Sequence, residues 1–364
     1  CFKNMELIKK SFWEGKKVFI TGHTGFKGGW LSLWLQKLGA DVYGYALEAD
    51  GQENLYDIAE VGDGMHSTFG NILDYSYLEK VLISFDPDIV FHLAAQPLVL
   101  EGYNSPRETY LTNIIGTVNL LECLRKVRSV KSVVNVTTDK CYQNIGSKIE
   151  FSEDHPLGGN DPYSSSKASA EIISHAYRKS YFCDQGISLA TARAGNVIGG
   201  GDWGKFRIIP DILRALKTGE RLKVRNPYSI RPWQHVLEPL QGYLLLGQVL
   251  YNNEDWADSG WNFGPRDDEA VTVRELIELI SDLWGESLIW DVEKNNTNNE
   301  DRELRLSSRK AESLLSWNNV WSLREAMTHT VHWFREYREG KDMKAVTHDQ
   351  ISEYTKRLDI INNT

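Results

Sequence analysis

The chain has 364 residues, of which 41% are hydrophobic and 25% are charged, and its formal net charge is −9. This composition is ordinary for a globular protein, and the length suits one and a half to two domains. The acidic balance gives no electrostatic support for binding nucleic acid. No apolar run reaches the ~18 residues that a membrane span needs. We therefore expect neither a nucleic acid nor a membrane as a partner.

The cysteines also exclude some classes of site. Cys1, Cys123, Cys141 and Cys183 form no Cys-x-x-Cys pair, and no cluster of histidines accompanies them. We expect no metal site and no disulfide framework, and a reducing cytoplasm is the simplest location. The N-terminal residues lack the apolar core of a signal peptide. Since the chain begins with Cys, Met5 is a candidate for the native start.

Short apolar runs alternate with helical segments through the first half of the chain. An amphipathic helix is expected over 30–38, and a long helix is expected to begin near Pro162. Strands are predicted at residues 17–22, 41–47, 88–95, 133–137 and 187–193. Strands that alternate with helices predict an α/β fold with a parallel, doubly wound sheet of the Rossmann type.

The alternation weakens beyond about residue 194. Residues 199–202 and the polar stretch 295–300 read as loops, and helices are predicted at 209–217 and Val273–Trp284. We expect residues 1–193 to form the doubly wound domain and residues 194–364 to form mainly a smaller, mixed α/β domain. Residues 236–250 are apolar enough to pack against the sheet, so a segment of roughly 232–263 is expected to return to the first domain.

A glycine-rich turn lies between the first predicted strand and the following helix. Gly22, Gly25 and Gly28 would let the backbone approach a pyrophosphate, and the helix N-terminus would supply amide donors. The alternative is a tight turn that binds no ligand. The acid that usually ends the second strand is missing or displaced to Glu48, and no Arg lies nearby to hold a 2′-phosphate, which favours NAD over NADP. Asn71 either contacts adenine or makes a local turn.

A tyrosine and a lysine are spaced for oxidising an alcohol. Tyr163 and Lys167 are four residues apart on the predicted helix, so they share one face. Pro162 suits the helix start, and Asp161 is a candidate cap. A nearby ammonium and a nicotinamide cation would favour the phenolate of Tyr163, whose pKa is ordinarily about 10. Taken alone, the pair is as consistent with two surface side chains, but Thr138 after a buried strand and the glycine turn favour function.

Together these residues resemble the extended short-chain dehydrogenase/reductase family. The resemblance rests on the glycine turn, Thr138, the Tyr163–Lys167 pair, and residues 92–96, 113–117, 193–199 and 230–236. It implies tightly bound NAD, a nucleotide-sugar substrate, and a homodimer or homotetramer built on a pair of helices. The residues that it implies for NAD binding are Gly22, Thr24, Gly25, Phe26, Gly28, Asn71, Ile72, Ala94, Ala95, Thr137, Tyr163 and Lys167.

Several longer phrases, among them residues 138–142 and 193–203, are most similar to the branch of the family that dehydrates CDP-sugars. That similarity implies a lyase that converts CDP-D-glucose to CDP-4-dehydro-6-deoxy-D-glucose and water, in the synthesis of deoxyhexoses for the O-antigen. The implied reaction oxidises C4, eliminates water across C5 and C6, and returns the hydride to C6. The alternatives are a nucleotide-sugar 4-epimerase and a non-catalytic NAD-binding protein.

Asp139 and Lys140 separate these alternatives, because eliminating water needs an acid and a base beyond the Tyr–Lys pair. Relatives that act on dTDP-sugars carry Asp-Glu here, so Lys140 is a departure that agrees with the CDP-sugar branch. We predict that Asp139 is the general acid, with a pKa raised by desolvation. Lys140 is then the base at C5, which requires a neutral amine. Alternatively, Lys140 pairs with Asp139 and orients it, which would oppose the raised pKa.

A diphosphate needs compact cationic contacts, and arginine offers bidentate ones. Arg231 and Arg302 match positions that bind the pyrophosphate in relatives, and Asn196 matches a substrate-contacting Asn. Arg207 and Arg193 are further candidates. The resemblance also implies Gln96 as a substrate residue. Tyr228 either stacks on the base or packs in the core.

Overall fold

The structure is a computed structural model that describes residues 8–51, 53–144, 149–266, 270–293 and 304–363. Its centre is a parallel sheet of seven strands in the order β12-β7-β5-β4-β1-β2-β3. The strands are β1 (Lys17–Thr21), β2 (Asp41–Ala46), β3 (His66–Phe69), β4 (Ile89–His92), β5 (Ser132–Val136), β7 (Ser188–Ala194) and β12 (Gly260–Phe263). This order confirms the doubly wound α/β sheet expected from the alternating pattern.

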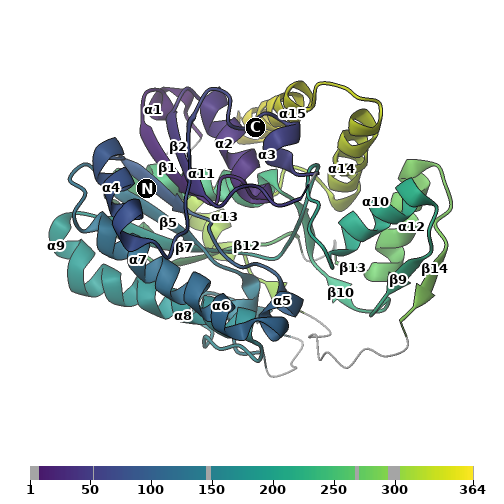
Figure 1. The fold of residues 1–364 in the computed structure, drawn as a ribbon, viewed down its shortest axis with the longest axis horizontal. Coiled ribbons are helices and arrows are strands. Elements are labelled where there is room, and N and C mark those ends of the chain that lie inside the picture. Colours follow the sequence, from purple (N-terminus) through teal and green to yellow (C-terminus); the bar gives the residue numbers. More distant parts are fainter. Residues whose placement is uncertain (1–7, 52, 145–148, 267–269, 294–303, 364) are drawn as a thin grey trace.

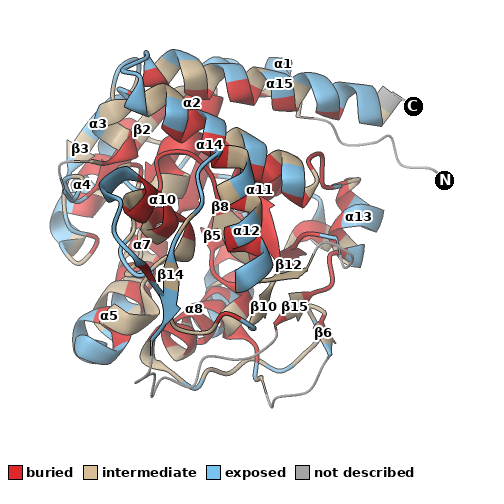
Figure 2. Ribbon diagram, turned by 90° about the vertical axis from the view of Figure 1, so that its right-hand side faces the viewer, coloured by how far each residue is buried: buried red, intermediate tan, exposed pale blue. Residues whose placement is uncertain are grey.

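The sheet is buried on both faces, as its apolar strands predict. Val18 and Ile20 of β1 belong to one core cluster, whereas Phe19 between them belongs to the other. On the second face lie α4 (Tyr75–Phe85), α7 (Gly116–Leu124) and α8 (Pro162–Tyr177) (Figure 1). Figure 2 shows the central strands in red, whereas much of α13 (Arg309–Leu315) and α15 (Met343–Asn363) is pale blue.

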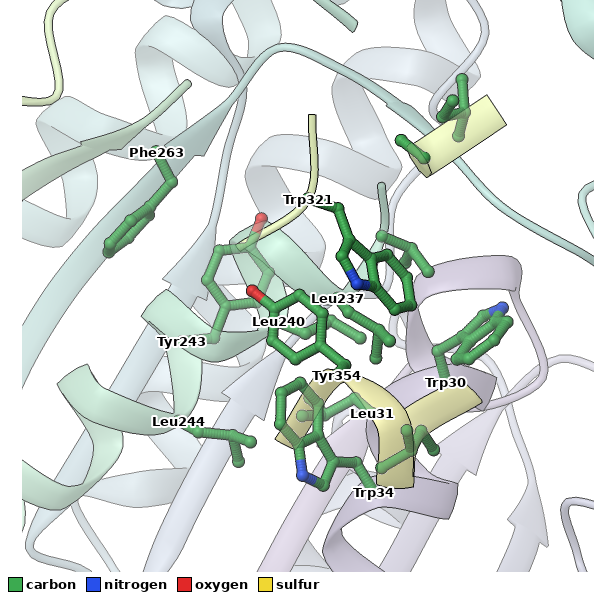
Figure 3. Packing of buried hydrophobic residues seen from close by; sticks show 14 of the residues in the cluster. Trp30, Leu31, Trp34, Leu237, Leu240, Tyr243, Leu244, Phe263, Trp321 and Tyr354 are labelled. Carbon is green, nitrogen blue, oxygen red and sulfur yellow. The ribbon is translucent and has the colours of Figure 1, made fainter. Parts of the chain in front are cut away.

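The first core cluster lies between α2 (Phe26–Lys37), α11 (Leu237–Tyr251) and the C-terminal α15. Figure 3 shows Trp30 and Trp34 of α2 beside Leu240 of α11 and Tyr354 of α15, and the rings of Trp34 and Tyr354 lie 5.7 Å apart. The prediction that this first helix is amphipathic is wrong. Its residues 28–35 are all buried, because α11 and α15 cover the sides that a solvent-facing helix would expose.

The second half of the chain is divided between the sheet and a lobe beside it. α11 packs against β4, β5 and β7, and β12 adds the last strand of the sheet. The lobe in Figure 1 contains α10 (Ile208–Thr218), α12 (Val273–Trp284), β9 (Leu222–Val224), β10 (Ile230–Arg231), β13 (Val271–Thr272) and β14 (Trp290–Val292). The assignment of residues 1–193 and 194–364 to two domains stays a proposal.

The remaining elements are short, apart from the 16-residue helix at Leu323–Arg338, whose buried apolar residues belong to the first core cluster. They are α1 (Lys10–Trp13), α3 (Leu55–Ile58), α5 (Val99–Asn104), α6 (Pro106–Tyr110), a π-helical turn at Leu111–Ile115, β6 (Glu150–Phe151), a second π-helical turn at Arg178–Phe182, α9 (Cys183–Gln185), β8 (Asn196–Ile198), β11 (Trp233–His235), a turn at Asp255–Ala257, β15 (Arg305–Leu306) and α14 (Leu323–Arg338). In the part of the chain that the structure describes, no helix is both long and apolar enough to cross a bilayer.

All seven strands run in one direction, so their carboxyl ends meet at a single edge of the sheet. The chain order reverses between β1 and β4, which lie side by side. In doubly wound sheets this switch point is where the connecting loops separate and ligands bind. The glycine turn follows β1, and Thr138 and Asp139 follow β5 at the same edge.

Candidate active site

The glycine turn brings three backbone segments too close together for side chains. Gly22 has a φ of +81°, and a Cβ there would lie 2.7 Å from the backbone nitrogen of Ala94. A Cβ at Gly28 would lie 2.1 Å from the carbonyl oxygen of Gly22. Gly25 caps the start of α2. The turn therefore leaves backbone amides at a helix N-terminus without side chains over them, a geometry that fits a dinucleotide pyrophosphate.

The other residues predicted for NAD binding lie along the same edge. Thr24 Oγ1 donates to the carbonyl oxygen of Leu47 at 2.9 Å, and Ile72 is buried beside Gly116. The Asn71 side chain accepts from Leu73 N at 2.9 Å, which is the local turn considered as its alternative. Phe26 lies beside Gly199, the Ala94 and Ala95 backbone follows β4, and Thr137 follows β5.

Lys27, inside the glycine turn, is a residue that the sequence reasoning missed. Its side chain is half-buried and interacts electrostatically with Asp139 and Lys167. Burial, together with the nearby Arg207 and Lys167, lowers the pKa of Lys27 to about 8, although Asp139 and Asp202 oppose the change. Lys27 therefore adds a cation between the glycine turn and the catalytic groups. A lysine between Phe26 and Gly28, next to the N-terminus of a predicted helix, was the available signal.

Tyr163 and Lys167 lie on the buried face of α8, as their spacing predicts. The helix begins at Pro162, and the Asp161 side chain caps it by accepting from Ser164 N at 2.9 Å. Lys167 Nζ donates to the carbonyl oxygen of Val136 at 3.0 Å, and burial lowers the Lys167 pKa to about 8. Burial raises the Tyr163 pKa to about 12, against a hydrogen bond with Thr138.

Asp139 and Lys140 lie in a single helical turn directly after β5. We call residues 138–141 the catalytic turn. Asp139 is 4% exposed, and its Oδ1 accepts from Thr138 Oγ1 at 3.0 Å. Burial raises the pKa of the Asp139 carboxyl, and this effect exceeds the opposing influence of Lys140, Thr138, Lys27 and Arg231. Within the described ranges, no ion pair joins Asp139 to the half-buried Lys140.

One pocket at this edge is lined by Asp139, Lys140, Asn196 and Arg231. Its remaining walls, largely missed by the sequence reasoning, come mainly from α5 and from the loop before α8. α5 contributes Val99, Leu100 and Tyr103, and the loop before α8 contributes Gly159, Asn160 and Asp161. Ser164 of α8, Tyr142 and Asn144 after the catalytic turn, and Leu304 before β15 complete the lining. The glycines that precede Asp161 were the signal for a loop at this position, but nothing local indicated that it lines the pocket.

The other predicted substrate residues have different surroundings. Arg207 Nη1 bonds both carboxylate oxygens of Asp202, at 2.9 and 3.0 Å. The Gln96 side chain accepts from Leu98 N and donates to Thr109, and Arg193 is 5% exposed and bonded to Glu171. Tyr228 is 74% exposed, which excludes its core alternative. Arg302 and the predicted loop 295–300 lie outside the described residues.

No candidate metal centre is present in the described part of the chain, where no three His, Cys, Asp or Glu side chains converge. The groups at this edge are a phenol, three amines, a carboxyl and a hydroxyl around a glycine cradle. That arrangement can move protons to and from a sugar held beside a dinucleotide. Fold and site together define a protein of the extended short-chain dehydrogenase/reductase class.

Residues 19–330 match the family model described as GDP-mannose 4,6 dehydratase, and the chain belongs to this family. It is 48% identical over 353 residues to the CDP-glucose 4,6-dehydratase of Salmonella typhimurium (strain LT2), covering 96% of this chain and 98% of that relative. It is 26% identical to the UDP-glucose 4-epimerase of Halalkalibacterium halodurans, covering 89% of this chain and 97% of that relative.

Solved structures share this fold along most of their length. The dTDP-glucose 4,6-dehydratase DesIV from Streptomyces venezuelae, solved with NAD bound, has a TM-score of 0.76 and 25% identity, covering 90% of this chain and 99% of that chain. The epimerase Mth375 from Methanothermobacter thermautotrophicus has a TM-score of 0.81 and 26% identity, covering 91% and 96% respectively. Dehydratases and epimerases therefore share this architecture, and only the site can separate them.

Proposed function

We propose that this protein is an NAD-dependent lyase that converts CDP-D-glucose to CDP-4-dehydro-6-deoxy-D-glucose and water. The observation that carries the proposal is the buried carboxyl of Asp139, which opens into the pocket beside Lys140 and keeps a raised pKa despite that lysine. An epimerase has no water to expel and needs no such acid. The extensive identity to a dehydratase of CDP-glucose supports the choice of nucleotide.

The glycine turn would hold the cofactor pyrophosphate, and Lys167 would hold the nicotinamide ribose. NAD, when bound, would supply the hydride acceptor for oxidation at C4 and the hydride donor for reduction at C6. Nothing in the described site resembles a clamp for a 2′-phosphate near Glu48, which favours NAD over NADP.

Tyr163 takes the proton of the C4 hydroxyl in the first step. Its phenol has a pKa of about 12, so the phenolate depends on positive charge nearby, including Arg207 and, once bound, the cofactor. Thr138 lies close enough to the phenol to oppose the rise of its pKa, and it would help to keep the phenol beside the sugar. The ketone that forms at C4 acidifies the proton on C5.

Lys140 removes the C5 proton, and Asp139 protonates the C6 hydroxyl as water leaves. Each role requires its uncharged form, and an ion pair between the two side chains would hold both in the charged form. The structure places the Asp139 carboxyl against the Thr138 hydroxyl instead. This arrangement supports the acid and base roles over the alternative in which Lys140 only orients Asp139.

Arg231 and Asn196 line the same pocket and would contact the diphosphate and the sugar. Arg302, Arg207 and Gln96 remain proposed substrate residues on the resemblance alone. We also propose a homodimer or homotetramer, a cytoplasmic location, and a place in the synthesis of deoxyhexoses for surface polysaccharide.

The proposal is tested by incubating the purified protein with CDP-D-glucose and NAD and measuring product mass. Loss of one water with a new ketone supports the dehydratase. Unchanged mass with inverted C4 would make the protein an epimerase, and no change with any nucleotide sugar would make it a binding protein. Tyr163→Phe is the control, since it should abolish product formation without removing the pocket.

A further inference from the structure

Two charged side chains of α8 hold the carboxyl end of β5. Lys167 and Glu171 lie four residues apart on the buried face of this helix. Lys167 Nζ donates to the carbonyl oxygen of Val136, and the hydroxyl of the next residue, Thr137, donates to Glu171. The catalytic turn begins at the residue after Thr137. The helix that carries the Tyr163–Lys167 pair therefore also fixes the strand end from which Asp139 and Lys140 project.

Arg193 of β7 connects Glu171 to the other end of the catalytic turn. Its Nε and Nη2 donate to Glu171 at 2.9 and 2.7 Å, and its Nη1 donates to the Tyr142 hydroxyl at 2.7 Å. Tyr142 directly follows the catalytic turn, and its hydroxyl donates to Asn262 of β12 at 2.7 Å. One buried ion pair thus bonds the residue before the turn and the residue after it.

The pair is charged and lies outside the lining of the pocket. Glu171 is 4% exposed and Arg193 is 5% exposed, and neither lines the pocket. Burial would raise the pKa of the Glu171 carboxyl, but Arg193 and the hydroxyl donors hold that pKa below its usual value. The pair therefore stays ionised beside Lys167.

We propose that the Glu171–Arg193 pair is a positioning unit that fixes the catalytic turn relative to Lys167. Neither residue lines the pocket, so loosening the pair should displace the catalytic groups without removing a side chain from the pocket wall. The expected result is a lower kcat with little change in KM. The kcat measurement rests on the proposed function. The position of the catalytic turn does not, because thiol labelling follows it without turnover.

Arg193→Lys is the main test, because lysine keeps the charge but lacks the planar guanidinium whose separate nitrogens bond Glu171 and Tyr142. Arg178→Lys is the matched control. Arg178 is 6% exposed, bonds the carbonyl oxygen of Leu189 and pairs with Asp258 at 3.1 Å. It joins the same helix region to the opposite end of β7. We expect kcat of Arg193→Lys to fall about 10-fold or more, since a displacement of ~1 Å can cost about 100-fold.

Thiol labelling follows the catalytic turn without any turnover. Cys141 lies in the turn and is 0% exposed, whereas Cys123 is equally buried in a different core cluster. In Arg193→Lys, Cys141 should react faster with a thiol reagent and Cys123 should not. In Arg178→Lys, both should react as in the wild type. Mass spectrometry of the labelled peptides separates the two sites.

A second pair of variants covers the case in which Arg193→Lys does not fold. Thr137→Val and Thr191→Val each remove one hydroxyl donor from the Glu171 carboxylate, but only Thr137 adjoins the catalytic turn. Thr137→Val should lower kcat and speed Cys141 labelling more than Thr191→Val does. Equal effects within either pair, or an unchanged labelling rate, would overturn the proposal. A wild type that leaves CDP-D-glucose unchanged would instead refute the proposed function, and labelling would still test the positioning unit.

Discussion

Replacing Asp139 by Asn should separate oxidation of the sugar from loss of water. Asparagine is nearly isosteric and keeps an Oδ1 that can accept from Thr138, which now donates to Asp139 at 3.0 Å. The amide cannot deliver a proton to the C6 oxygen. The side chain is 4% exposed, so solvent has little access to replace the acid. We therefore expect the oxidation at C4 to survive and the elimination to slow.

The size of the loss follows from what a positioned acid contributes. General acid catalysis is worth about 100- to 10,000-fold, which corresponds to ~3–5.5 kcal/mol of barrier. Because burial keeps solvent from Asp139, we expect the upper half of this range, about 1,000-fold or more in turnover. In stopped-flow absorbance at 340 nm, the Asp139→Asn variant should form reduced cofactor and retain it, while mass spectrometry detects little water loss.

The control is Asp282→Asn, which makes the same chemical change at an exposed position on α12. It should turn over like the wild type. If Asp139→Asn keeps a turnover within about tenfold of the wild type, below the least that a general acid supplies, the acid is another group. If the variant fails to reduce the cofactor at all, Asp139 supports the oxidation step instead.

Further predictions concern the base, the cofactor cradle, the pH profile and the core. Lys140→Met should abolish exchange of the C5 proton with deuterated solvent while cofactor reduction persists, and retained exchange would remove Lys140 as the base. Gly28→Ala should weaken NAD binding, measured by calorimetry, because its Cβ would lie 2.1 Å from a backbone oxygen. The oxidation rate should fall as pH rises through about 8, where Lys167 loses its proton and charge, and Lys167→Arg should move this limb to higher pH. Tyr354→Phe should lower the free energy of urea unfolding by about 1.5–3 kcal/mol, because the buried Glu238 carboxylate loses a donor at 2.7 Å.

The sequence predicted β1, β2, β4, β5 and β7, because continuous apolar runs bounded by polar turns have few other solutions. It did not predict β12 as a strand, although residues 232–263 were expected to return to the first domain. It missed β3, whose residues include His66, Ser67 and Thr68, since this edge strand is mostly exposed and carries no apolar pattern. It also misjudged α2, because α15 covers that helix from the far end of the chain. No local periodicity near α2 reports such a contact.

Spacing located Tyr163 and Lys167, because both lie on one helix and four residues always return to the same face. The same rule extends to Glu171, yet a glutamate on a helix is ordinarily a solvated residue. Its role depends on Arg193 and Thr137, which approach from two strands. Those partners meet because their strands are neighbours in the sheet. The spacing of residues along the sequence does not show which strands are neighbours.

Asp139 and Glu171 show why protonation at this site needs the full structure. Both carboxyls are 4% exposed, so both lose most of their hydration. Glu171 bonds Arg193 directly and has a pKa below the usual value, whereas Asp139 accepts from a hydroxyl and has a raised pKa. A buried acid that must give up a proton cannot sit beside a bonded cation, and a buried anchor cannot do without one. Asp139 therefore serves catalysis and Glu171 serves positioning. An arginine bonded to Asp139 would keep that carboxyl ionised, and a hydroxyl in place of Arg193 would leave Glu171 without its cation, so either change should abolish the corresponding role.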